Sequence, residues 1–147
     1  MPLSTGHIGL NVTDLDRSLA FYRDVLGFSP LAEGKEEDRR YVFLGDGEQL
    51  VLTLWQQAGE PYGPDRAGLH HLAFRADSVE RVRAYETALR AYGAEFAYEG
   101  VVAHAEGAGS GGIFFHDPDG TRLEISVPDG AEGAPAPHES APTCGFF

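Results

Sequence analysis

The sequence has little cysteine, little positive charge and no long apolar run. Its single cysteine, Cys144, excludes an internal disulfide and a thiolate metal site. Eleven basic side chains against 23 acidic ones give a formal net charge of -12, which repels phosphate backbones and anionic lipid headgroups. No segment has the apolar length of a membrane span, and the first residues lack the pattern of a signal peptide. We therefore expect a cytoplasmic protein whose partners are neither nucleic acid nor membrane.

The composition is sufficient for a hydrophobic core. The chain has 147 residues, of which 42% are hydrophobic and 11% aromatic. At this length a chain buries about two thirds of the surface that its unfolded form exposes. The length is typical of one compact domain or of two small repeated modules.

Both halves of the chain carry the same pattern, which favours two modules. A histidine is followed by an alternating segment, an Asp, an amphipathic stretch and a Gly, over residues 7–27 and again over residues 71–93. His7 and His71 are therefore equivalent. Further on, matching the Asp-Gly turns of residues 45–52 and 118–125 makes Val51 the equivalent of Glu124.

Each repeat predicts the element order βαβββ. In the first module we expect a helix from Thr13 or Asp14 to Gly27 between strands at residues 7–12, 28–33, 40–44 and 49–55. In the second module we expect a helix that Asp77 caps and Gly93 ends, between strands at residues 71–76, 95–98, 112–116 and 121–127. The fold class that follows is α+β, with two βαβββ modules whose sheets form an incomplete barrel around one site.

The boundaries follow from composition. Residues 1–56 and 69–128 are the two modules, and residues 57–68, with two Pro and three Gly, are a linker. After residue 128 the sequence is rich in Gly, Ala, Pro and Glu, which predicts a flexible tail over residues 129–147.

The repeat predicts where metal-capable side chains meet. If the modules pair with pseudo-twofold symmetry, His7 and His71 enter one cavity, and Glu124 adds a carboxylate where its equivalent, Val51, is inert. Two His and one carboxylate suit non-haem Fe(II) and equally suit Zn²⁺. The alternative is that these are ordinary strand residues with no ligand role.

Several motifs, in this order, resemble those of the vicinal oxygen chelate superfamily. The motifs are His7-Ile8-Gly9-Leu10-Asn11-Val12 with Asp14, Arg17-Ser18 and Phe21-Tyr22, then His70-His71-Leu72-Ala73-Phe74, then the run from Phe115 to Glu124. The family includes glyoxalase I, extradiol dioxygenases, fosfomycin-resistance enzymes and metal-free bleomycin-resistance proteins. The resemblance covers about residues 5–128 and implies the fold more strongly than the reaction.

The resemblance implies a ligand set for a divalent metal ion. The metal ligands of the family fall on His7, His71 and Glu124, and Fe(II) is favoured over Mn(II), Ni(II) or Zn(II). The fourth ligand of glyoxalase I would fall on Val51, which argues against lactoylglutathione lyase activity. The fosfomycin type is weakened because the residues after Glu124 lack basic side chains. A twofold homodimer is also expected.

Two further residues are candidates for catalysis. His104, in a long loop of the second module, is placed to transfer a proton or is an exposed loop residue. Arg75 shares a strand face with His71, where it holds an anionic group of the substrate or forms a salt bridge at the rim.

Three functions therefore stay open. The first is a metal-dependent, dioxygenase-like enzyme acting on a small substrate with vicinal oxygens, either catechol-like or enolisable. The second is a protein that sequesters an antibiotic or a metabolite without chemistry. The third, a glyoxalase-type lyase or isomerase, is disfavoured by Val51.

Overall fold

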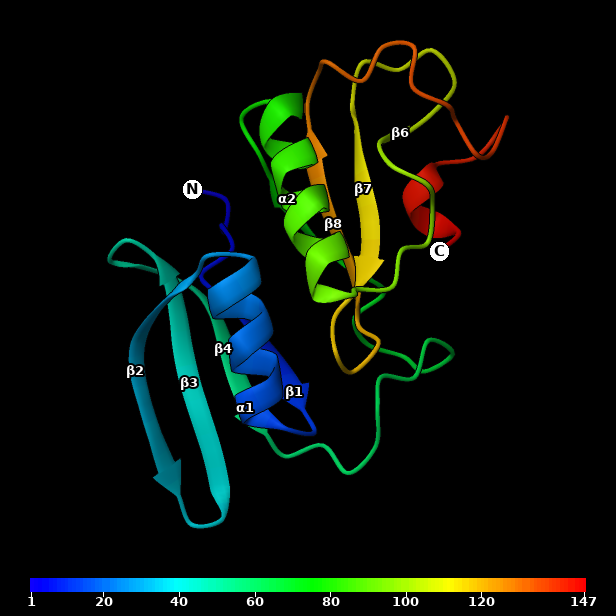
Figure 1. Ribbon diagram of the computed structural model, residues 1–147. Coiled ribbons are helices and arrows are strands. Elements are labelled where there is room, and N and C mark those ends of the chain that lie inside the picture. The colour runs from blue at the N-terminus through cyan, green and yellow to red at the C-terminus, as the bar shows by residue number, and fades with distance from the viewer. The chain divides into compact units, whose positions relative to one another are not determined.

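The computed structural model describes residues 1–147 as two compact units, Met1–Tyr62 and Gly63–Phe147, each with its own sheet and helix (Figure 1). The boundary falls within the linker that the sequence indicates at residues 57–68. No helix in the structure is both long and apolar enough to cross a membrane.

Unit 1 has the element order βαβββ. Its strands are β1 (Ile8–Val12), β2 (Ser29–Glu36), β3 (Arg39–Asp46) and β4 (Gln49–Gln56), and its helical segment consists of α1 (Leu15–Leu19) and the π-helix η1 (Ala20–Val25). The sheet order is β1-β4-β3-β2, with β1 parallel to β4 and the other pairs antiparallel. The helical segment packs on one face of this sheet, where Phe21, Tyr22, Val42, Leu52 and Leu54 are all fully buried.

The helix of unit 1 begins at the expected place but is not a regular α-helix throughout. Asp14 is its N-cap, and its carboxylate accepts a hydrogen bond from the backbone N–H of Arg17. In the π turns Phe21 and Tyr22 are both buried, whereas Leu19, which regular helical spacing predicts for the buried face, is only half-buried. The backbone continues to Gly27, which has φ 83°.

Unit 2 repeats the order around a second sheet. Its strands are β5 (Leu72–Arg75), β6 (Val102–Ala103), β7 (Gly111–His116) and β8 (Arg122–Val127), and its helices are α2 (Val79–Tyr92) and the short 3₁₀ turn η2 (Thr143–Gly145). The sheet order is β5-β8-β7-β6, with β5 parallel to β8. Helix α2 covers one face, as Figure 1 shows, and buries Val82 and Leu89 against β7 and β8.

Two expectations for unit 2 are corrected. The N-cap of α2 is Ser78 instead of Asp77, because the Ser78 hydroxyl accepts the backbone N–H of Arg81. Residues 95–98 do not form a strand. They contribute only one isolated bridge, between Phe96 and Phe115, and the outer strand is the two-residue β6.

The expected fold class is confirmed as α+β with two βαβββ modules. Strands pair only within their own four-stranded sheet, so hydrogen bonding does not close the two sheets into a barrel. In each sheet, the face opposite the helix carries the residues that alternate with the core positions, and these include aromatic side chains such as Trp55 in unit 1 and Phe114 in unit 2.

The strand register changes which residue of unit 1 is equivalent to Glu124. Residue Gly9 pairs with Thr53 in unit 1, and Ala73, the counterpart of Gly9, pairs with Glu124 in unit 2. Thr53, and not Val51, therefore stands where Glu124 stands. The second turn contains Asp117 and Asp119 two positions apart, and matching the wrong one shifts the alignment by two residues. Val51 and Thr53 are two positions apart and therefore lie on the same face of the strand, so the correction changes the residue but not the face.

The C-terminal residues make extensive contacts in unit 2. Thr143 is fully buried, and its hydroxyl and backbone N–H donate to the carbonyl oxygens of Ala103 and His104, at 2.6 and 2.9 Å. The backbone N–H of Ala103 donates to the Pro135 carbonyl. The segment expected to be a flexible tail thus lines the outer strand β6, and its flexibility stays a prediction.

Candidate metal and substrate site

The candidate site of unit 2 is built on the sheet face opposite α2. Alternation along β8 sends Leu123 and Ile125 into the core and Glu124 to the other face. Glu124 pairs with Ala73 of β5 and with Phe114 of β7 in the register. His71 is two positions before Ala73, so it belongs to the same face. Glu124 is only 3% exposed, although it is a carboxylate.

Two imidazoles contact the two oxygens of Glu124. His104 Nε2 is in hydrogen-bond contact with Glu124 Oε1. His71 Nε2 lies 3.8 Å from Glu124 Oε2. A carboxylate only accepts hydrogen bonds, so His104 Nε2 carries the hydrogen in this contact. Imidazole and carboxylate groups are ligands that divalent transition metals accept, and here His71 Nε2 and the Glu124 carboxylate are the two such groups that no hydrogen separates.

The spacing of His71 and Glu124 fits a shared ion. A nitrogen ligand lies about 2.0–2.1 Å and an oxygen ligand about 2.0–2.2 Å from a bound Zn²⁺, so the two atoms are at most about 4.3 Å apart. The observed 3.8 Å is within this reach. Burial lowers the pKa of His71 from its ordinary value, although the Glu124 carboxylate acts in the opposite direction. A neutral imidazole is the form that binds a metal ion.

His71 is oriented by its neighbour in the chain, His70. His70 Nδ1 lies 2.9 Å from His71 Nδ1. This contact leaves Nε2 as the ring nitrogen that faces Glu124. A hydrogen bond on the far nitrogen of a ligand histidine fixes its tautomer and ring orientation. The adjacent His-His pair is the only sequence signal that indicates this contact.

The third predicted metal ligand, His7, belongs to unit 1, and each unit is described by itself. His7 is exposed and directly precedes β1. Unit 1 has its own open cavity of about 490 Å³ on the face that carries Asn11 and Trp55. The structure thus brings together His71, Glu124 and His104. No group of three or more His, Cys, Asp or Glu side chains in it is arranged as a metal site.

Arg75 lies at the exposed end of β5, opposite Ser126 of β8. It is four positions after His71 on the same strand, so both belong to one face. Its guanidinium makes no hydrogen bond or ion pair within the structure. An exposed cation without a partner is available to an anionic group of a substrate.

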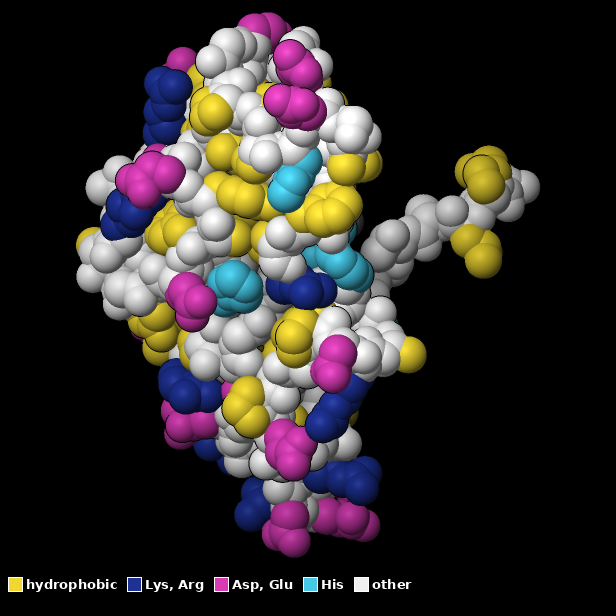
Figure 2. Space-filling view, turned by 90° about the vertical axis from the view of Figure 1, so that its right-hand side faces the viewer, with side chains coloured by type: hydrophobic (Ala, Val, Ile, Leu, Met, Phe, Trp, Pro, Cys, Tyr) yellow, Lys and Arg dark blue, Asp and Glu magenta, His cyan; other side chains and the backbone are white.

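The face around these residues is aromatic. The Phe114 ring packs edge-to-face against His104, Tyr98 and Phe147. In Figure 2, histidine side chains lie beside hydrophobic ones on one face of the molecule. Burial raises the pKa of the Cys144 thiol, and the nearby Glu124 carboxylate adds to this effect. Cys144 is therefore a neutral thiol near the site.

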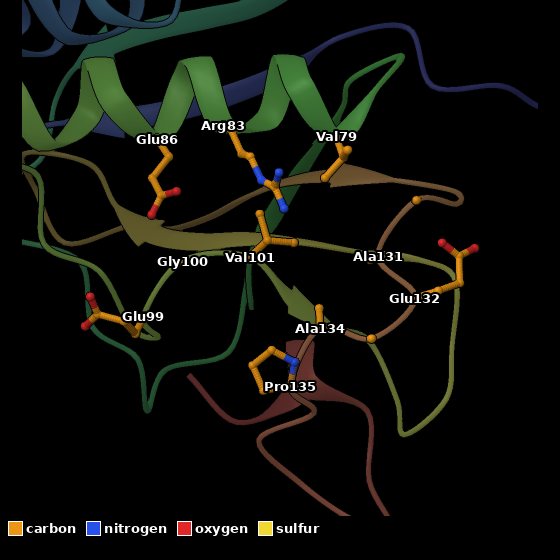
Figure 3. Close-up of a pocket in the computed structure, with 12 residues that line it drawn as sticks. Val79, Arg83, Glu86, Glu99, Gly100, Val101, Ala131, Glu132, Ala134 and Pro135 are labelled. Carbon is orange, nitrogen blue, oxygen red and sulfur yellow. The ribbon is translucent and has the colours of Figure 1, made fainter.

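Unit 2 has a cavity of about 420 Å³ that lies apart from these residues. It is bounded by α2, residues 99–101 and residues 130–135, and Figure 3 shows Arg83 and Glu86 projecting from α2 toward Val101. None of the predicted site residues lines this cavity, so substitutions of its side chains can serve as controls for substitutions in the site.

Comparison with known proteins identifies the family. The family model described as Glyoxalase/Bleomycin resistance protein/Dioxygenase superfamily matches residues 4–125, and the chain belongs to this superfamily. The resemblance seen in the sequence is thereby confirmed.

Individual relatives differ in their reactions. The chain is 29% identical over 122 residues to a catechol-2,3-dioxygenase of Bacillus subtilis, covering 82% of this chain but only 40% of that protein. It is 35% identical over 137 residues to a lactoylglutathione lyase of Haemophilus influenzae, covering 81% of this chain and 88% of the lyase. A third relative, at 32% identity over 126 residues, is a manganese-dependent 2,3-dihydroxybiphenyl 1,2-dioxygenase of Geobacillus genomosp. 3, of which the match covers 35%, against 82% of this chain.

Solved structures show the same fold. The crystal structure of a glyoxylase/bleomycin resistance protein/dioxygenase domain from Frankia sp. EAN1pec matches with a TM-score of 0.70 at 23% identity, covering 86% of this chain and 93% of that one. At this identity the match supports the fold alone.

Proposed function

We propose that this protein is a divalent-metal-dependent enzyme that acts on a small substrate through two adjacent oxygen atoms, in the manner of a dioxygenase. The proposed ligands are His7, His71 and Glu124. The observation that carries the proposal is the convergence of the His71 and His104 imidazoles on the buried Glu124 carboxylate. Burying a carboxylate costs free energy unless the group is paired or binds a metal, so the burial of Glu124 supports a role for its charge in metal binding.

Each candidate residue has a separate role in the proposed reaction. Fe(II) is the favoured ion, with Mn(II), Ni(II) or Zn(II) as alternatives, and a bound ion acts as a Lewis acid that stabilises negative charge on the substrate oxygens. His104 holds a proton at Nε2 and exchanges it with a substrate oxygen or with Glu124. Arg75 orients an anionic group of the substrate from the end of β5. The two dioxygenase relatives support this assignment.

A glyoxalase-type lyase is the second candidate, because the Haemophilus influenzae relative carries that name. It is disfavoured by the residue at the fourth ligand position. The register places Thr53 there, and a neutral hydroxyl is a poorer ligand than a carboxylate. Sequestration of a ligand without chemistry remains the third candidate, and it requires no metal.

Elemental analysis and oxygen uptake test these candidates together. Protein is prepared without oxygen, its metal content is measured, and oxygen uptake is followed with a panel of catechols. We expect about one ion per chain and uptake with at least one catechol, and we expect His7→Ala and Glu124→Ala to lose both.

The matched control is Arg83→Ala, which changes the separate cavity of unit 2. This variant should keep the metal and the uptake. Metal without oxygen uptake would favour the lyase, and ligand binding that survives both a chelator and Glu124→Ala would favour sequestration.

A further inference from the structure

The side chain of Phe147 fills part of the candidate site. Its ring centroid lies 5.8 Å from that of His71, 4.9 Å from that of Phe114 and 6.1 Å from that of His116. All three contacts belong to the sheet face that carries Glu124. His71 is one of the proposed metal ligands, so the ring lies against a side chain that a metal-bound substrate would also adjoin.

Residues 142–147, which we call the strap, are held firmly at one end. Thr143 is fully buried, and it makes two hydrogen bonds to the backbone of β6 and the residue after it. The Tyr98 hydroxyl donates to the carbonyl oxygens of Thr143 and Phe146, at 3.3 and 3.2 Å, but it has one hydrogen to share between them. The strap is thus fastened at Thr143.

The other end of the strap is held weakly. Gly145 and Phe146 are exposed, and the Phe146 side chain, at 57% exposed, rests on His138 instead of on the site. Phe147 is only half-buried and contributes one ring to the face. A rotation near Gly145 would withdraw this ring and leave intact the two hydrogen bonds that Thr143 donates to Ala103 and His104.

We propose that the strap regulates access to the site, with Phe147 as an internal occupant that a planar ligand must displace. The inference rests on the proposed function, because it takes the substrate to bind beside His71. Phe147 packs edge-to-face on His71 and Phe114 and at a tilt on His116, so the ring of an aromatic ligand replaces the contacts that Phe147 loses. Ligands without such a ring would compete less well with the strap.

Removing the ring tests the competition directly. The binding of 2,3-dihydroxybiphenyl is titrated calorimetrically against the wild type, Phe147→Ala and Phe146→Ala, each with and without a chelator. If the ring occupies the site in about nine molecules of ten, Phe147→Ala lowers the dissociation constant about tenfold. Phe146→Ala is the matched control and should leave it unchanged within about twofold, because its ring contacts His138 and not the site.

A second readout follows the strap itself. Trp55 is the only tryptophan, so Phe147→Trp in a Trp55→Phe background reports the position of residue 147 by its fluorescence. We expect the emission to shift to the red when 2,3-dihydroxybiphenyl binds, because the indole moves into water. Neither measurement requires turnover.

The outcomes separate this inference from the proposed function. If the wild type holds no metal but Phe147→Ala still binds the probe more tightly, the metal proposal fails and the strap remains. If Phe147→Ala binds the probe as the wild type does, or more weakly, the ring does not compete with the ligand and the inference is overturned. An emission maximum that stays unchanged at saturating probe would also overturn it.

Discussion

Glu124 is the residue on which the candidate site depends. Its carboxylate is almost completely buried, and both of its oxygens face imidazole nitrogens. A hydrogen bond to a charged group contributes about 1.5–3 kcal/mol, more than a neutral one, and a metal ion would add to this. The charge of Glu124 therefore matters more than its shape.

Glu124→Gln separates charge from shape. The amide keeps the size and one acceptor oxygen, but it loses the negative charge that a divalent ion requires. We expect metal affinity to fall by at least about 100-fold, since even residues that only support a ligand cost 10–100-fold. Titration with Mn²⁺ measures this, and Glu99→Gln, an exposed residue at the separate cavity, is the control. Equal affinity in the two variants would mean that Glu124 is not a ligand.

A second prediction concerns Thr53, which has in unit 1 the position that Glu124 has in unit 2. Thr53 is 3% exposed, so Thr53→Glu buries a new charge and should lower the melting temperature of the metal-free protein. If all four positions surround one ion, added Mn²⁺ should then raise the melting temperature more than it does in the wild type.

The control for this prediction is Thr53→Val, which removes the hydroxyl and keeps the volume nearly constant. It should leave metal affinity unchanged. A Thr53→Glu protein that responds to Mn²⁺ no more than the wild type would show that this position does not reach the ion.

At the scale of the elements, the helical segment of unit 1 contains an unsatisfied group. Ser18 lies in α1, one helical turn after Leu15, and its hydroxyl is fully buried with no hydrogen-bond partner. A buried polar group without a partner costs about 1–3 kcal/mol. The position of Ser18 thus carries a cost that the rest of the core offsets.

Ser18→Ala should stabilise the protein. The substitution removes the unsatisfied hydroxyl and leaves a void of one atom, so we expect the free energy of unfolding to rise by about 1 kcal/mol. Urea unfolding measures it, with Ser4→Ala at an exposed position as the control. A loss of stability in Ser18→Ala would mean that the hydroxyl has a partner in solution, such as a bound water.

At the scale of the whole molecule, the proposed ligand set takes its residues from both units. His7 lies in unit 1, whereas His71 and Glu124 lie in unit 2. An ion that binds the folded state and not the unfolded chain stabilises it by about 2.7 kcal/mol at 100 times its dissociation constant. The formal charge of -12 also favours the binding of cations in general, so the specific effect needs a variant in each unit.

Thermal unfolding with and without Mn²⁺ makes this test. For a chain of this length each kcal/mol shifts the melting temperature by about 2–4 °C, so saturating metal should raise it by roughly 5–10 °C. His7→Ala and Glu124→Ala should both abolish the shift, whereas Arg83→Ala should retain it. A full shift in His7→Ala would mean that unit 2 binds the ion without His7. The expected homodimer stays a prediction, which sedimentation of the same samples checks.

The sequence by itself determined the element order, the fold class and the family. Alternating and helical spacings depend on neighbours a few positions away, so strands such as β4 and β8 and the start of α1 were predictable from their own residues. The repeat of His7 at His71 and the alternation along β8 also predicted the face of Glu124. The π turns of η1 were not predictable, because core packing overrides the regular helical period there.

Only the tertiary structure decided which distant residues meet. The pairing of Gly9 with Thr53 made Thr53, and not Val51, the equivalent of Glu124. Register depends on hydrogen bonds between strands and not on turn residues that look alike. The contact of His104 with Glu124 and the position of the Phe147 ring join segments 20 or more residues apart. The flexible tail that composition predicts stays a prediction, but only the structure shows that Thr143 and Phe147 each contact other residues of unit 2.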